Sequence, residues 1–420
     1  MAASDPAEVR SRGGASPGGR RFAAPSVIVA ALAASALLGF LVIRYSATNA
    51  LLKASPQMAM GLWSAHPRAV LTGALEDLQL TGEADPAAER AALAAFRSSP
   101  LSEAPLLIQA REAMNDSRDA QADRLIAEAI RRNPRSRYAL LLRLDQDVRL
   151  GRVAEAAETM AMLSRTSGNV GPLVTAQLAA LAADPRTRPA AKRAMASDPQ
   201  LLANVLEMLA RRGADAAAVL DVAGDVRPVR PGAEPPQWQR LLIDGMVERG
   251  QVAQARRLWV ELMGADPAAA GHPVYDRDFA GLGGPPPFNW LLETGSNGYA
   301  ERSNGALEVQ FDGRDDARLA SQLLLLPPGT YRLSFTAQGE ATGEGGLLSW
   351  TVACHPGASA IVVSEITGVG FDAKRIEGSF TVPPTRCPGQ WLRLVGKAAE
   401  FPKEQQVTIR QFRIERGGGR

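Results

Sequence analysis

The sequence predicts a multidomain chain of the α-then-β type: one membrane-spanning helix, a long helical region and a C-terminal antiparallel β-sandwich. Three observations support this. An uncharged apolar run covers residues 22–43, and apolar residues recur at helical spacing through residues 46–270. Short alternating apolar runs, separated by Gly and Pro, fill residues 274–416. A chain of 420 residues is long enough for two or three such domains.

The apolar run has the length that a transmembrane helix needs. A bilayer core of about 30 Å takes about 20 apolar residues at ~1.5 Å each. We place the helix at residues 25–45, with Pro25 in the first turn, where a missing N–H costs least. The alternative is a cleaved secretory signal peptide, with small residues at Thr48 and Ala50 near the cleavage site.

The tail before this helix predicts its orientation. Residues 1–24 are rich in Gly, Ser and Pro and carry more Arg than acidic residues, so we expect a disordered tail. Short basic segments stay in the cytoplasm. The Ala- and Arg-rich, Lys-poor composition indicates a GC-rich bacterial genome. We therefore predict a single-pass protein of the bacterial inner membrane, with a cytoplasmic N-terminus and its bulk in the periplasm.

Charge and histidine content exclude several classes of partner. The net charge is +3, and no Lys/Arg block is interleaved with aromatic residues, so no nucleic-acid partner is predicted. The three histidines, His66, His272 and His355, are scattered in the chain and do not have the spacing of a zinc site. No cofactor is predicted.

Both cysteines, Cys354 and Cys387, lie in the β region. A pair of cysteines in an exported domain most simply forms one disulfide, which the chain-entropy model values at roughly 3–4 kcal/mol. Two buried free thiols are the alternative, favoured only if the bulk of the chain is in the cytoplasm. The absence of a C-x-x-C motif argues against a redox role.

The helical region, residues 46–270, contains a repeat. Ala122, Ala129 and Pro134 have counterparts 34 residues later, and the phrase GRVAEAAETM returns as GQVAQARRLW. A 34-residue period with a small residue early in the second helix resembles the tetratricopeptide repeat family. The resemblance implies stacked helix pairs with a concave groove for a protein partner. A helical spacer without a ligand is the alternative, and residues 264–273 are the predicted linker to the next domain.

The C-terminal region, residues 274–416, holds most of the aromatic residues and eight predicted short strands. Their motifs resemble jelly-roll domains of the galactose-binding and carbohydrate-binding-module type, and the resemblance implies contact with a glycan or an envelope protein. Four segments carry it: an opening strand at Asp278 and Phe279, residues 287–290, residues 326–331 and the closing strand VTIRQFRIER.

Candidate site residues are few, and no catalytic residue is predicted, because neither a nucleophile elbow nor a P-loop is present. Tyr299, in an expected glycine-rich loop, is the preferred ligand platform, since loops carry binding residues. We expect Trp290, Trp350 and Trp391 to lie in the core. Three aspartates in one turn are weak Ca²⁺ candidates without the spacing of a calcium loop: Asp312, Asp315 and Asp316.

We therefore predict a non-enzymatic, membrane-anchored scaffold. Its helical repeats bind a protein partner and its sandwich contacts a glycan or an envelope protein, with a role in polysaccharide assembly or export. A carbohydrate-active hydrolase or lyase with its site in the sandwich is the first alternative, and a purely structural spacer is the second.

Overall fold

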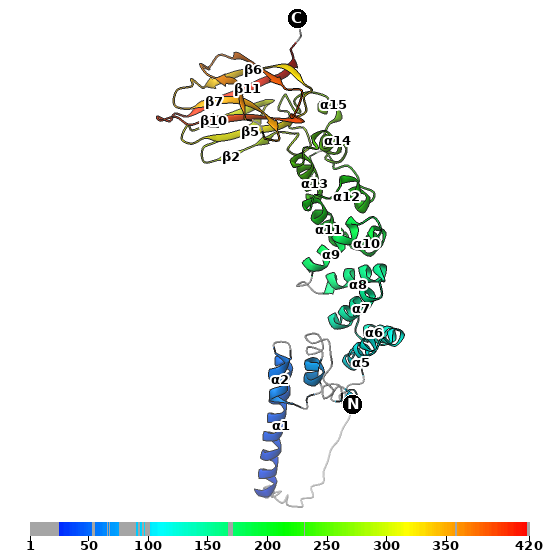
Figure 1. The fold of residues 1–420 in the computed structure, drawn as a ribbon. Coiled ribbons are helices and arrows are strands. Elements are labelled where there is room, and N and C mark those ends of the chain that lie inside the picture. Colours follow the sequence, from blue (N-terminus) through cyan, green and yellow to red (C-terminus); the bar gives the residue numbers. More distant parts are fainter. Residues whose placement is uncertain are drawn as a thin grey trace, which may run out of the picture. The chain divides into compact units, whose positions relative to one another are not determined.

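The computed structural model (Figure 1) has two compact units, Met1–Gln146 and Asp147–Arg420. It describes residues 25–52, 55–64, 66, 68–74, 90, 93, 94, 96, 101–166, 171–230, 232–357 and 359–417. The predicted disordered tail, residues 1–24, lies outside the described residues. The predicted domain division, with its linker at residues 264–273, stays a prediction.

The first unit begins with a long apolar helix, α1 (Pro25–Leu51). Among the described residues, one helical stretch, Ala33–Leu51, is long and apolar enough to cross a membrane, a test that a signal sequence also passes. Its apolar side chains contact little else, and Val42 and Ile43 are 63% and 69% exposed. The helix therefore presents an apolar surface that the rest of its unit does not cover.

A polar and aromatic cluster forms where the apolar part of α1 ends. The next helix, α2 (Pro56–Leu62), is capped by the Ser55 side chain. Arg44 donates from Nε to the Leu62 carbonyl oxygen at 3.1 Å, and its guanidinium carbon lies 4.8 Å from the centre of the Trp63 ring. The ring of His66 lies 5.2 Å from that of Trp63.

A helical hairpin forms the core of the remainder of the first unit. Helices α5 (Ala104–Asn115) and α6 (Asp119–Arg132) pack on each other, and the structure continues into α7 (Arg137–Arg149). Ala122 and Ala129, the small residues of the predicted repeat, are fully buried with Ile126. Small side chains at these positions let the two helices approach closely.

The second unit begins with paired helices. Along this array, α9, α11 and α13 lie next to one another, and α8 packs against α10 (Figure 1). Tight turns join the partners of each pair, as at Gly250 between α13 and α14, whose φ of 76° favours glycine. The helices are α8 (Val153–Thr166), α9 (Gly171–Ala183), α10 (Arg188–Met195), α11 (Pro199–Arg211), α12 (Ala216–Ala223), α13 (Gln237–Glu248), α14 (Val252–Leu262) and α15 (Pro267–Ala270).

Two antiparallel sheets follow, so the described chain is helical first and β second, as predicted. The five-stranded sheet has the order β1-β5-β10-β7-β8, and the six-stranded sheet has the order β2-β3-β4-β11-β6-β9. The strands are β1 (Leu291–Leu292), β2 (Thr294–Gly295), β3 (Gly298–Ser303), β4 (Ala306–Phe311), β5 (Ala317–Leu324), β6 (Gly329–Glu340), β7 (Leu347–His355), β8 (Ile361–Ile366), β9 (Lys374–Val382), β10 (Gly389–Lys397) and β11 (Gln405–Arg416).

Three details differ from the sequence-based expectation. Residues Asp278 and Phe279 form a turn rather than an opening strand, and Phe279 has a φ of 51° that a strand does not adopt. Strands β3 and β5 were not expected. In β5 the six residues from Leu319 to Leu324 are all buried, which removes the alternation that reveals a strand in a sequence.

The sandwich core is aromatic. The rings of Trp350 and Phe412 lie 4.8 Å apart, and Trp290, Phe335 and Phe279 join them. Trp290 and Trp350 are buried, as predicted. A disulfide joins Cys354 on β7 to Cys387 just before β10, which confirms the predicted pairing.

The last helical pair packs directly on the sandwich within the second unit. Trp259 of α14 is fully buried and donates its indole N–H to the Pro285 carbonyl oxygen at 2.8 Å. Its ring lies 4.9 Å from that of Tyr275, edge to face. His355 of β7 lies 2.8 Å from the Val247 carbonyl oxygen of α13, measured from Nε2. These contacts cover the outer face of the five-stranded sheet near β5.

Candidate functional site

The six-stranded sheet has a polar outer face with a hollow in it. Alternation along each strand turns one set of side chains into the core and the other set outward. The register pairs Thr408 of β11 with Glu308 of β4 on one side and with Gln338 of β6 on the other. Together they border a hollow of about 270 Å³ that is lined by Tyr299, Glu308, Val309, Gln338, Gly339, Gln406, Val407 and Thr408.

Tyr299 lies at one end of this hollow, on β3. The sequence predicted a loop for it, but the chain turns at Ser296 and Asn297 and Tyr299 pairs with Gln310 of β4. Gly298 makes this approach possible: its φ is 147°, and a Cβ there would lie 2.3 Å from the Gln310 carbonyl oxygen. Tyr299 is therefore a half-buried ring on a paired strand, which holds it more firmly than a loop would.

A second aromatic residue lies beside the other end. Gln338 donates from Nε2 to the Phe371 carbonyl oxygen at 2.7 Å, and the Gly339 amide donates to the Gly370 carbonyl oxygen at 2.9 Å. These two bonds fix the loop between β8 and β9 to strand β6. Phe371 is 79% exposed, although a side chain of this type is usually buried. Sequence analysis missed it, because one Phe in a glycine-containing loop gives no periodic signal.

The lining of the hollow is polar but carries no cation. Its ionisable groups are the Glu308 carboxyl and the Tyr299 phenol, and the amides of Gln338 and Gln406 and the Thr408 hydroxyl complete the polar groups. Amides and hydroxyls both donate and accept hydrogen bonds, while an ionised carboxylate only accepts them. Such a set matches a neutral ligand with many hydroxyl groups, provided that an apolar face of the ligand can lie on an aromatic ring.

The hollow is wide relative to one sugar ring. Tyr299 and Gln338 are three strand spacings apart, since β4 and β11 lie between β3 and β6. Neighbouring strands are about 4.8 Å apart, so these positions are separated by about 14 Å. A short oligosaccharide fits this span better than a single sugar does.

The three candidate Ca²⁺ ligands do not converge. Asp315 and Asp316 are exposed, and Asp316 accepts a hydrogen bond from the Ala398 amide at 2.8 Å from its Oδ1. Among the described residues no group of three His, Cys, Asp or Glu side chains has the geometry to hold a metal ion. Asp312 and its neighbours thus shape a turn next to β4.

Trp391 lies away from the hollow. It is half-buried on the outer face of the five-stranded sheet, so the expectation of a core position was wrong for this tryptophan. The Arg393 guanidinium carbon lies 5.4 Å from the centre of its ring, and partial burial lowers the pKa of Arg393. Register explains the difference: Leu392 and Leu394 face the core, which turns Trp391 and Arg393 outward.

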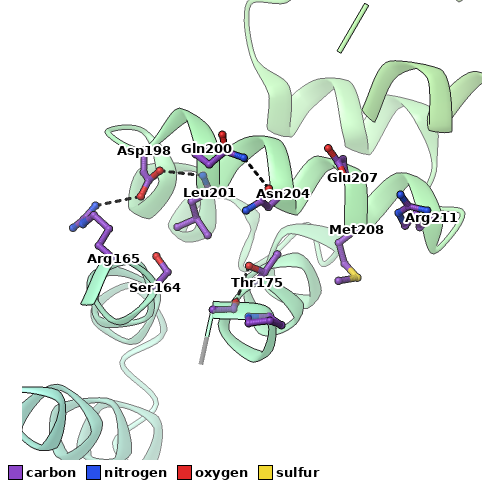
Figure 2. A pocket seen from close by; sticks show the side chains of 12 residues that line it. Ser164, Arg165, Thr175, Asp198, Gln200, Leu201, Asn204, Glu207, Met208 and Arg211 are labelled. Atoms are coloured by element: carbon purple, nitrogen blue, oxygen red, sulfur yellow. Dashed lines mark hydrogen bonds and ion pairs between the residues drawn. The ribbon is translucent and has the colours of Figure 1, made fainter. Parts of the chain in front are cut away.

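The helical array has a groove of its own. Figure 2 shows a hollow of about 430 Å³ between α8, α9 and α11, with the side chains of Asn204, Glu207, Met208 and Arg211 along α11. Gln200 donates to the Asn204 side-chain oxygen at 3.1 Å. Both charge signs and two amides line it, a combination suited to an extended peptide whose backbone groups need partners.

Charged groups define the end of this groove near α8. Asp198 caps α11 by accepting from the Leu201 amide at 3.0 Å, and its other oxygen lies 3.8 Å from the Arg165 guanidinium (Figure 2). Thr175 donates its hydroxyl to the Gly171 carbonyl oxygen at 2.9 Å. The sequence did not reveal this groove, because its residues come from three helices.

Comparison with known proteins gives structural matches alone. No family model and no curated protein matches the chain. Among solved structures, it is similar to TmCBM61, a carbohydrate-binding module in complex with β-1,4-galactotriose, at 16% identity and a TM-score of 0.22, over 30% of this chain and 88% of that one. A structure titled for the structure and function of CBM4 matches at 14% identity and a TM-score of 0.24, over 31% and 88%.

A third match is the CBM22-2 xylan-binding domain of Xyn10C from Paenibacillus barcinonensis. It has 14% identity and a TM-score of 0.23, over 31% of this chain and 92% of that domain. At these scores the similarity assigns neither a ligand nor an activity to this chain.

Proposed function

We propose that this protein is a non-enzymatic, membrane-anchored binding protein whose β-sandwich binds a neutral oligosaccharide on the outer face of its six-stranded sheet. One observation carries the proposal: a hollow on this face is lined by an aromatic ring, amides and a hydroxyl, and by no cation. Tyr299 contacts the apolar face of a sugar ring, and Gln338, Gln406, Thr408 and Glu308 bind its hydroxyls. The role is a scaffold in polysaccharide assembly or export.

A glycan array probed with the purified full-length protein tests this. We expect binding to neutral oligosaccharides, and Tyr299→Ala should weaken it by about tenfold, the equivalent of ~1.4 kcal/mol. Phe401→Ala is the matched control, since Phe401 is 76% exposed and lies outside the lining of the hollow. Equal binding by the wild type and Tyr299→Ala, or no binding to any glycan, would remove this half of the proposal.

The anchor belongs to the same proposal. The exposed apolar length of α1 suits a bilayer, and Arg44, Tyr45 and Trp63 gather where that length ends. Aromatic and basic side chains of this kind favour the membrane–water interface. Alkaline extraction of membranes should leave the full chain in the pellet, whereas a cleaved signal would release a shorter chain. A reporter fused to the C-terminus should be active in the periplasm and silent in the cytoplasm.

The helical groove supports a second binding function for a protein partner. Its amides at Gln200 and Asn204 and its mixed charges fit an extended peptide segment, as the resemblance to tetratricopeptide repeats implies. Crosslinking from a photoreactive residue in place of Met208 should capture that partner, whereas the same residue in place of exposed Leu173 should not. Equal capture from both positions, or from neither, favours the spacer alternative.

A hydrolase or lyase remains the alternative for the sandwich. Glu301 and Glu308 are paired in register across β3 and β4, but Glu308 alone lines the hollow. Two carboxylates on opposite sides of a bound sugar are what glycoside cleavage needs. Prolonged incubation with each bound glycan, followed by mass spectrometry, should return the glycan intact.

A further inference from the structure

A second hollow lies within the Asp147–Arg420 unit, between the last helices and one end of the sandwich. It has a volume of about 590 Å³ and lies between the end of α14, the segment after α15, the turn before β6 and the end of β11. Its charged and titratable side chains are Arg256, His272, Arg277, Glu415 and Arg416. Three guanidinium groups thus share one hollow with a single carboxylate.

Arg256 is the most deeply buried of these, with 9% of its surface exposed. Its Nη2 donates to the Ala270 carbonyl oxygen at 2.9 Å, and its guanidinium carbon lies 5.4 Å from the ring centre of Phe288. Within the described residues no carboxylate lies within 4.0 Å of it. Burial lowers the pKa of Arg256, and the neighbouring Tyr275 offsets this in part.

A buried guanidinium without a carboxylate is unusual. Charged groups are rarely buried unless they are paired, because burial removes the water that stabilises the charge. The five N–H donors of arginine also need acceptors, and one carbonyl oxygen satisfies few of them. The remaining donors lie on a side chain that lines the hollow. An anion in this hollow would accept them and balance the charge.

The other walls limit the size and nature of that anion. Leu325, Pro327 and Tyr331 supply apolar surface, and the Tyr331 hydroxyl already donates to the Pro327 carbonyl oxygen at 2.7 Å. Arg277 is partly neutralised by Asp278, with 3.5 Å between its Nε and Oδ2, while Arg416 donates from Nη2 to the Pro328 carbonyl oxygen at 3.0 Å. The volume falls within the range of about 300–1,000 Å³ that small organic ligands occupy.

We infer that this hollow is a binding site for a small organic anion, with Arg256 as the paired cation and Arg277 and Arg416 as supporting cations. The ligand carries a carboxylate or a phosphate, because a guanidinium binds either group with two parallel hydrogen bonds. A uronic acid combines a carboxylate with a sugar ring that the apolar wall accommodates. The site uses none of the residues that line the Tyr299 hollow and does not depend on the function proposed for them.

Titration calorimetry on the purified full-length protein tests this with three probes. Glucuronate supplies a ring with a carboxylate, glucose supplies a neutral ring of the same size, and inorganic phosphate supplies an anion without a ring. We expect glucuronate to bind at millimolar concentrations and glucose not to bind at this site. Phosphate binding with the same dependence on Arg256 assigns the site to phosphate-bearing ligands instead.

Arg256→Met should weaken anion binding by at least about tenfold, because it keeps the apolar stem and removes the charge. Arg393→Met is the matched control, because Arg393 is also partly buried over an aromatic ring but lies outside this hollow. If Arg256→Met fails to fold, as far-UV circular dichroism would show, the exposed Arg416→Gln should still weaken binding.

Two results would overturn the inference: no binding of glucuronate or phosphate to the wild type, or unchanged binding by Arg256→Met and Arg416→Gln. Tyr299→Ala separates this inference from the proposed function. It should reduce binding of neutral oligosaccharides and leave glucuronate binding unchanged, whereas Arg256→Met should do the reverse.

Discussion

The Gln338 side chain donates a hydrogen bond to the carbonyl oxygen of Phe371 at 2.7 Å, and so ties an exposed aromatic residue to the strand that borders the hollow on the six-stranded sheet. Gln338→Ala removes this bond as well as one polar group of the hollow. We expect affinity for a bound oligosaccharide to fall by about tenfold, near 1.4 kcal/mol. Phe371→Ala should have a similar effect if the Phe371 ring contacts the same ligand.

Thr330→Ala is the control for this prediction. Thr330 lies on the same strand, and its hydroxyl is 3.3 Å from that of Thr381, so a side-chain contact is lost at a distance from the hollow. Affinity measured by calorimetry should be unchanged. A loss as large as that of Gln338→Ala would mean that the variants act through the sheet as a whole.

Trp259 should be among the most sensitive positions for stability. Trp259→Ala leaves a cavity where a fully buried indole packs on Tyr275 and Phe288, a change that typically costs about 3–5 kcal/mol. Trp259→Phe keeps much of the volume but leaves the Pro285 carbonyl oxygen without its donor, at about 1–3 kcal/mol. Urea unfolding measures both, and half-buried Trp391→Phe should change stability less than either.

Reduction of the Cys354–Cys387 disulfide should destabilise the sandwich. The bridge closes a loop with a sequence separation of 33, for which the chain-entropy model gives about 3–4 kcal/mol. Dithiothreitol should lower the midpoint of thermal unfolding of the wild type. The double variant Cys354→Ala/Cys387→Ala should unfold at the lower temperature with or without it. Ready labelling of either cysteine by a maleimide in untreated protein would contradict this.

The pH dependence of stability should report on Asp276. Burial raises the pKa of this carboxyl, although Arg302 at 3.0 Å and the backbone amides of Ala280 and Gly281 oppose the shift. A carboxyl whose folded pKa is raised penalises the folded state when ionised. Its contribution to stability is fully present below its usual value of 3.8 and is lost as pH rises through the folded pKa.

Lowering the pH from neutral towards 3.8 should therefore relieve this penalty. We expect Asp276→Asn to lack this component, so that its unfolding midpoint falls more steeply with acid than that of the wild type. Thermal unfolding across this pH range measures both slopes. Parallel curves would show that the ion pair with Arg302 keeps the pKa of Asp276 at its ordinary value.

Much of the architecture could be predicted from periodicity. Ala122 and Ala129 mark a helical pair, and Cys354 and Cys387 form the expected disulfide. Strand β5 escaped prediction because the helices cover its second face, so its burial does not alternate. Burial on both faces depends on packing between distant segments, which a local pattern does not record.

The candidate site was predicted in part. Tyr299 was singled out correctly as a residue of a hollow, but for the wrong local reason, since it lies in β3 rather than in a loop. Its neighbours Glu308, Gln338 and Thr408 come from three other strands, and strand order is not visible in the sequence. The anionic hollow needs Arg256 and Arg416 together, 160 positions apart in the chain.

The packing of α13 and α14 on the sandwich makes these helices a third layer of that domain. Val252 fills the space beside Gly389, where a Cβ would lie 3.0 Å from its methyl group, and His355 bonds to α13. A gene truncated at residues 264–273 would encode an orphaned sandwich with this surface stripped bare. The shortest autonomous fragment should thus start ahead of Gln237, and recombination between related genes should preserve these helices and strands as one inherited block.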